Sequence, residues 1–152
     1  TATSRMPSSD GLKLGVDRVV DYTKESFPEV VFAETDNKGA DIVMVCPTYP
    51  EAMQEGVQCA GRSSRVLLFM GPKPGTMLSV DMNKIYFDEI DLISSYSCGP
   101  TETREARWLI NHGVSTAEQM ITHHFPLEKI NDAVALSRQA QNSLKIIIDI
   151  ND

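Results

Sequence analysis

The feature of this sequence that most constrains its fold is the alternation of short apolar runs with segments of helical periodicity. The clearest run, Asp41-Ile42-Val43-Met44-Val45-Cys46, is apolar at nearly every position. Such a run is typical of a strand that is buried on both faces of a parallel sheet. Strands that alternate with helices are joined by crossover connections, which are almost always right-handed. The sequence therefore predicts an α/β fold with a doubly wound parallel sheet.

The other elements of the first part of the chain follow from the same patterns. Strands are expected at residues 18–22, 41–46, 65–70 and 91–96, and helices at 23–37 and 49–60. After Tyr96 the pattern changes, with helices expected at 100–111 and after Pro126 and a last strand at 144–150. Trp108 and Leu109 are core candidates of the first of these helices. We therefore divide the chain into residues 1–96 and residues 97–152, the second part being an α+β segment.

The usual beginning of a doubly wound sheet is missing from the sequence. Such a sheet starts with a strand, a glycine-rich turn and a helix whose N-terminus holds a phosphate group. No Gly-x-Gly-x-x-Gly occurs anywhere, and residues 1–5 are typical of the end of a second strand. We therefore expect a partial sheet that lacks its first strand and its glycine-rich turn, and a chain that starts in mid-fold.

Charge and cysteine usage exclude several classes of function. The net charge is −7 and the basic residues are scattered, so no nucleic-acid partner is expected. The cysteines, Cys46, Cys59 and Cys98, form no Cys-x-x-Cys pair, which argues against a zinc knuckle or a redox dithiol. Free thiols favour a reducing compartment, and we expect a cytoplasmic protein. No apolar run approaches the roughly 20 residues that a bilayer requires, so no membrane segment is expected.

Adjacent histidines, His123 and His124, are the most obvious metal-binding candidates. Neighbouring residues of an extended segment point to opposite sides, so the two rings cannot easily face one ion. We therefore predict no metal site and no catalytic residue within this sequence.

A series of segments along the chain carries a family resemblance. They are residues 15–22 (GVDRVVDY), 37–43 (NKGADIV), 62–68 (RSSRVLL), 95–106 (SYSCGPTETREA), 121–127 (ITHHFPL) with 130–133 (INDA), and 144–147 (LKII). In this order they resemble the zinc-type medium-chain dehydrogenases, and most closely the alcohol, sorbitol or polyol, and threonine dehydrogenase branch. The chain departs from the family where Arg62-Ser63 or Ser63-Ser64 replaces a Gly-Gly pair, and where Cys46-Pro47 replaces a small residue and a glycine.

The resemblance implies a partial Rossmann-like domain in residues 1–96 and a C-terminal segment, 97–152, that packs back on a catalytic domain. It implies an NAD(P)-dependent enzyme that transfers hydride between nicotinamide and a secondary alcohol, either a small alcohol or a polyol. It also implies a catalytic zinc held by an N-terminal domain, whose ligand motifs are not found here. Residues 91–96 are the expected edge strand for a homo-oligomer.

Two alternatives remain open. The chain could be a non-catalytic, truncated domain that acts by nucleotide binding or subunit association, because it lacks the glycine turn and the zinc ligands. A zinc-independent quinone reductase is a weaker alternative, because residues 95–106 and 121–127 are more similar to the polyol branch.

The resemblance also assigns cofactor contacts, each with a simpler structural explanation. Ser4 and Arg5 are expected to bind the 2′-phosphate of NADP in place of the carboxylate that binds the ribose of NAD, with NAD as the alternative. Tyr22 is expected near the adenosine. Phe69 and Met70 are expected at the C-terminal end of a central strand, where such sheets bind ligands, although ordinary core packing is the slightly favoured explanation. Lys145 aligns with a phosphate-binding position, although it could be a solvated charge.

Overall fold

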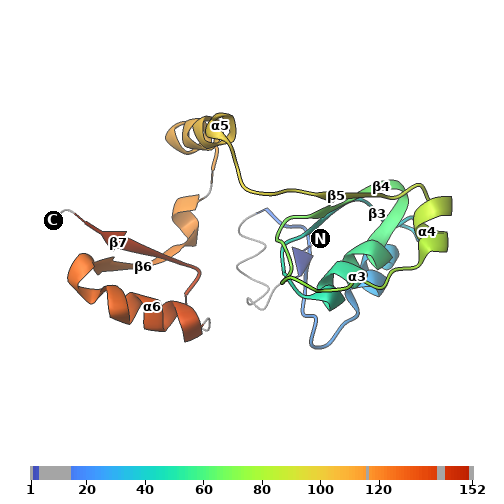
Figure 1. Ribbon diagram of the computed structural model, residues 1–152, viewed down its shortest axis with the longest axis horizontal. Coiled ribbons are helices and arrows are strands. Elements are labelled where there is room, and N and C mark those ends of the chain that lie inside the picture. Colours follow the sequence, from blue (N-terminus) through green and yellow to red (C-terminus); the bar gives the residue numbers. More distant parts are fainter. Residues whose placement is uncertain (1, 4–14, 116, 140–142, 151–152) are drawn as a thin grey trace. The chain divides into compact units, whose positions relative to one another are not determined.

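A computed structural model describes residues 2–3, 15–115, 117–139 and 143–150 of the chain. The chain divides into two compact units, Thr1–Ser97 and Cys98–Asp152, and each unit is described by itself. The first unit carries strands β1–β5 and helices α2–α4, and the second carries α5, α6 and strands β6 and β7 (Figure 1).

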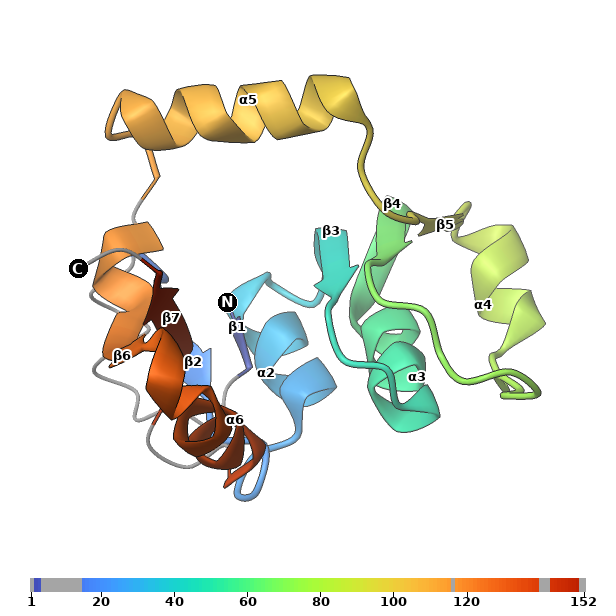
Figure 2. The ribbon, with the colours of Figure 1, turned by 60° about the vertical axis from the view of Figure 1, so that its left-hand side comes forward.

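The first unit contains two parallel sheets. Strand β1 (Ala2–Thr3) pairs with β2 (Val19–Val20), and Thr3 lies opposite Val20. Strand β4 (Ala60–Leu68) lies between β3 (Ala40–Val45) and β5 (Asp91–Ser94) in the larger sheet. Helix α2 (Phe27–Glu34) leads to β3, α3 (Pro50–Cys59) leads to β4, and α4 (Met82–Phe87) leads to β5 (Figure 2). The predicted alternation of parallel strands with helices is confirmed.

The core of this unit lies on one face of the larger sheet. Strands β3 and β4 contribute alternate residues, and Val43 pairs in register with Val66. Helix α3 packs on the same face through Met53 and Val57, both of which are buried. The buried cluster consists of Val31, Val43, Val45, Met53, Val57, Cys59, Ala60, Val66 and Ile90. These residues hold the strands that carry the candidate site.

The prediction that residues 41–46 are buried on both faces is wrong. Ile42 and Met44, which alternate with Val43 and Val45, are 72% and 60% exposed. Met44 pairs with Leu67, and Leu67 pairs with Ile93, so these side chains form an apolar row on the opposite face of the sheet. Among the described residues, helices pack only against the face of the sheet that carries Val43. The apolar row on the other face is therefore accessible to solvent.

Local interactions shorten the elements predicted before β3. The Asp21 carbonyl accepts hydrogen bonds from the amides of Lys24 and Glu25, so a turn replaces both the end of the predicted strand 18–22 and the start of the predicted helix 23–37. Helix α2 begins only at Phe27, with Pro28 in its first turn, where a missing amide costs nothing. It ends at Glu34, because Asp36 and Asn37 adopt positive φ values of 51° and 61°.

Strand β4 begins earlier and ends earlier than the predicted strand 65–70. Its register against β3 shifts between Ala40, which pairs with Ala60, and Ile42, which pairs with Arg65. Extra residues therefore bulge out of β4, and Ser63 adopts a φ of 53° in this bulge. The Ser63 amide donates to the Asp88 carbonyl at 2.6 Å, which holds this conformation without the glycine expected there.

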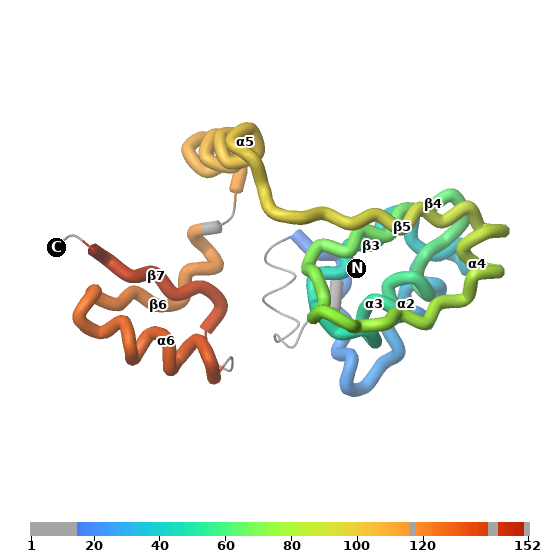
Figure 3. Tube along the Cα trace, in the orientation of Figure 1, coloured from blue at the N-terminus to red at the C-terminus, as the bar shows by residue number. Residues whose placement is uncertain are grey.

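The described part of the second unit contains two α-helices and a small parallel sheet. Helix α5 (Pro100–Asn111) has the predicted bounds, and the Glu102 carboxylate accepts a hydrogen bond from the Gly99 amide at 2.7 Å. Short 3-10 turns, η1 (Ala117–Met120) and η2 (Leu127–Lys129), flank β6 (Ile121–Pro126). Strand β6 pairs with β7 (Lys145–Asp149) through the crossover helix α6 (Ile130–Gln139), which Figure 3 traces.

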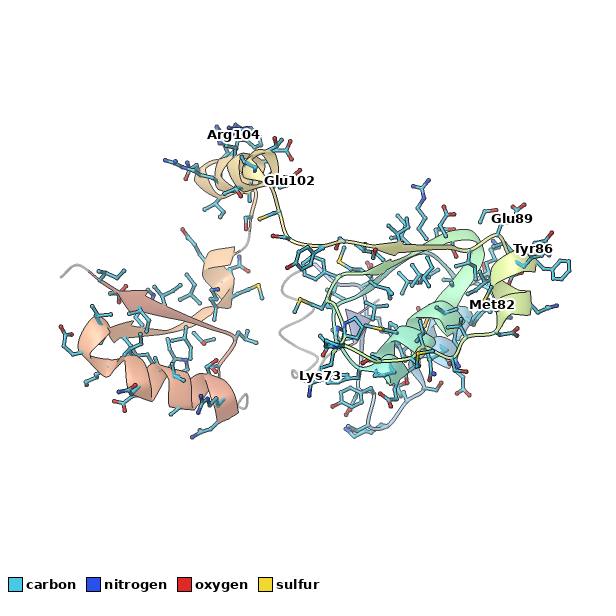
Figure 4. All side chains as sticks on the ribbon, in the orientation of Figure 1. Lys73, Met82, Tyr86, Glu89, Glu102 and Arg104 are labelled. Atoms are coloured by element: carbon cyan, nitrogen blue, oxygen red, sulfur yellow. The ribbon has the colours of Figure 1, made fainter. Side chains whose placement is uncertain are left out.

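The prediction that Trp108 and Leu109 belong to a core is wrong for this unit. Trp108 is 55% exposed, and its ring stacks on that of His112 at 4.3 Å between centroids. No residue of α5 is buried, and Glu102 and Arg104 project from its surface (Figure 4). Among the described residues, no helix has both the length and the apolar character that spanning a bilayer would require.

Candidate functional site

The candidate site lies at the carboxyl ends of the parallel strands in the first unit. Open α/β sheets bind ligands at this edge, because loops there are free to shape a crevice. Phe69 and Met70 follow directly after β4, and both side chains are about half exposed. The Phe69 amide donates to the Val45 carbonyl at 3.0 Å, which fixes the start of this loop against the end of β3. The two side chains are therefore available to a ligand at this edge.

Tyr22 lies at the corresponding end of the smaller sheet. It is the second residue after β2, and its side chain is exposed. Because β1 and β2 are parallel and Thr3 pairs with Val20, the two strands end at the same edge of the smaller sheet. Ser4 and Arg5, the proposed 2′-phosphate ligands, lie outside the described residues.

Asp21 lies between β2 and Tyr22 in the sequence, and its carboxylate is ionised. Its oxygens accept hydrogen bonds from the Thr23 hydroxyl at 2.6 Å and the Thr23 amide at 3.1 Å, and the Lys24 ammonium lies 2.7 Å away. These interactions lower the pKa of Asp21 to about 2, and the interaction with Lys24 has the largest effect. Asp21 is therefore negatively charged at neutral pH, and Lys24 is its immediate counter-ion.

A second ion-pair group connects β2 to helix α2. The Arg18 guanidinium contacts Glu25 at 2.9 Å and Glu34 at 2.8 Å. Both carboxylates are partly exposed, so the pairs contribute little stability individually. Arg18 is therefore held by these two carboxylates, away from the ligand edge. Lys24 is the cation that pairs with Asp21.

Two lysines near this edge were not selected from the sequence. Lys24 follows the predicted strand end, and Lys73 lies on the exposed loop that leaves β4 after Met70 (Figure 4). Their positions, two and three residues beyond the ends of the predicted strands 18–22 and 65–70, are the sequence signal that identifies them. Such a signal is weak, because isolated lysines are usually solvated charges.

The remaining candidates lie in the second unit. Lys145 is the first residue of β7, its side chain is exposed, and its carbonyl accepts a hydrogen bond from the Thr122 hydroxyl at 3.2 Å. His123 contacts that same hydroxyl, whereas His124 pairs with the carboxylate of Asp149 at 3.2 Å. The described residues contain no group of three or more His, Cys, Asp or Glu side chains that could hold a metal ion.

The cysteines differ sharply in accessibility. Cys59 ends helix α3 inside the core, where burial, followed by the nearby Glu55 charge, raises its pKa to about 12. Cys46 follows β3 and Cys98 precedes α5, and both are exposed. The buried thiol is therefore unreactive, because the thiolate is the nucleophilic form.

Treatment of the folded chain with iodoacetamide at pH 8 is expected to alkylate Cys46 and Cys98 but to spare Cys59. The protected thiol should react only after denaturation, when its pKa returns toward about 8.5. Tandem mass spectrometry of tryptic peptides, before and after addition of urea, measures this, because fragmentation distinguishes Cys46 from Cys59 within the shared peptide 39–62. Equal labelling of Cys59 and Cys46 in the native chain would show that α3 does not pack as described.

Comparison with known proteins gives these features a context. A family model described as zinc-binding dehydrogenase matches residues 2–112. A sorbitol dehydrogenase from Halalkalibacterium halodurans is 24% identical over 139 residues, which cover 90% of this chain and 39% of that protein. The chain thus spans about two fifths of the length of the curated relatives that it matches.

Solved structures share the fold. A zinc-binding dehydrogenase from Sinorhizobium meliloti 1021, bound to NADP, superposes with a TM-score of 0.85 at 19% identity, over 97% of this chain and 44% of that one. A short chain alcohol dehydrogenase from Escherichia coli CFT073, complexed with NADH, gives a TM-score of 0.83 at 21% identity, over 97% and 43%. The Rossmann-like α/β fold expected from the sequence is confirmed.

Proposed function

The chain belongs to the zinc-binding dehydrogenase family, and from that premise we propose that it is the cofactor-binding part of an NAD(P)-dependent alcohol or polyol dehydrogenase. The observation that carries the proposal is the family match over two parallel sheets, of which the smaller exposes Tyr22 after its carboxyl edge and the larger exposes Phe69 and Met70. When bound, the nicotinamide cofactor would supply the hydride chemistry between its ring and a secondary alcohol carbon. The residues of this chain bind and orient that cofactor.

Each part of the cofactor would meet a different group of residues. Phe69 and Met70 form one apolar wall for the nicotinamide, with their orientation held by the Phe69 amide on β3. Tyr22 packs near the adenosine, and Ser4 and Arg5 bind the 2′-phosphate. Lys145 supplies a charge for the cofactor phosphates.

We favour NADP over NAD because Ser4 and Arg5 offer donors at a position where NAD enzymes use a carboxylate. Similar folds occur with NADP in one protein and NADH in another, so the fold does not decide between them. The decision rests on side chains at the ends of β1 and β2. The described residues hold no cluster that fits a zinc ion, and the zinc implied by the resemblance would be held by an N-terminal domain.

The two parts of the chain have separate proposed roles. Residues 1–96 form the partial nucleotide-binding domain, and residues 97–152 pack back on the catalytic domain of the full enzyme. The whole enzyme is a cytoplasmic protein, and β5 pairs with its copy in a homo-oligomer. That pairing is supported by the position of β5 as one of the two outer strands of the described three-stranded sheet.

Subunit association without catalysis is the second candidate function. The outer strand β5 carries the exposed apolar residues Leu92 and Ile93, and Tyr96 beyond it is fully exposed. An accessible apolar edge strand is a template for pairing. Sedimentation of the chain combined with titration of NADPH and NADH would separate the two candidates, since a dimer that binds neither cofactor would favour association alone.

Replacement of Arg5 by alanine is expected to raise the Kd for NADPH by about tenfold and to leave the Kd for NADH nearly unchanged, because a charge-assisted phosphate contact is lost. Titration of each cofactor with the chain, followed by nicotinamide fluorescence, measures both constants. Arg104→Ala on α5 is the matched control, because it removes an exposed guanidinium elsewhere in the chain. If the unaltered chain binds neither cofactor, the proposed function is wrong.

A further inference from the structure

We draw no further inference here: the strongest candidate, the solvent-accessible apolar row that Met44, Leu67 and Ile93 form across strands β3, β4 and β5 on the face of the larger sheet opposite Val43, carries none, because nothing in the described part of the structure shows what covers it.

Discussion

Replacement of Gly61 by alanine is expected to lower the free energy of unfolding of the first unit by about 2–4 kcal/mol. A Cβ atom at this position would collide with the backbone carbonyl oxygen of Lys38, and it would lie 3.3 Å from the carbonyl carbon of Gly39. A Cβ added at Gly39 would in turn lie 2.8 Å from the Cα of Gly61. These are backbone atoms, so the clash can be relieved only by moving the starts of β3 and β4 apart.

Urea denaturation followed by circular dichroism measures the effect of Gly61→Ala. Gly71→Ala is the matched control, because a Cβ there meets nothing within 4 Å and the backbone is not left-handed. The control should change the free energy of unfolding by less than about 0.5 kcal/mol. If the two variants were equally stable, the close approach of the two glycines would not be a determinant of the fold.

Replacement of Met53 by alanine is expected to destabilise the first unit by about 2–5 kcal/mol, through lost burial and the cavity left behind. Met53 is 2% exposed and lies in the cluster that joins α3 to β3 and β4. The surrounding valines are short and β-branched, so they are poorly suited to fill the space. The magnitude depends on how far α3 can settle toward the sheet.

Met77→Ala is the control for this second prediction, since Met77 is 85% exposed. It should leave the midpoint of urea denaturation almost unchanged. Both midpoints are read from the same circular dichroism experiment. A Met53→Ala chain as stable as the Met77→Ala chain would contradict the assignment of the core.

These two positions also matter for the candidate site, although neither lies near it. Gly61 fixes where β4 starts against β3, and Met53 holds α3 on the face below them. The carboxyl ends of the same strands carry Phe69 and Met70. Variants that shift the strands are therefore expected to weaken cofactor binding in proportion to the loss of packing, without removing any ligand contact.

The sequence by itself determined the class of the fold and the order of most of its elements, although it did not predict helix α4. Apolar runs and helical periodicity are local properties, and the β3 and β4 segments and the exact bounds of α5 follow from them. The family resemblance in the ordered motifs is likewise a property of the sequence, and the match over residues 2–112 confirms it. The cofactor residues were also proposed from these motifs, and they remain predictions.

Only the tertiary structure decided which faces are covered and which charges meet. An apolar run does not encode whether both of its faces are covered, so Ile42 and Met44 were wrongly expected to be buried. Hydrophobic periodicity was equally misleading for Trp108, because burial requires a partner surface that the helix does not itself supply. The close approach of Gly39 and Gly61 depends on how two strands align, and no local pattern specifies that alignment. The contact of Lys24 with Asp21 depends on the turn that ends β2, where helical spacing alone predicted a helix.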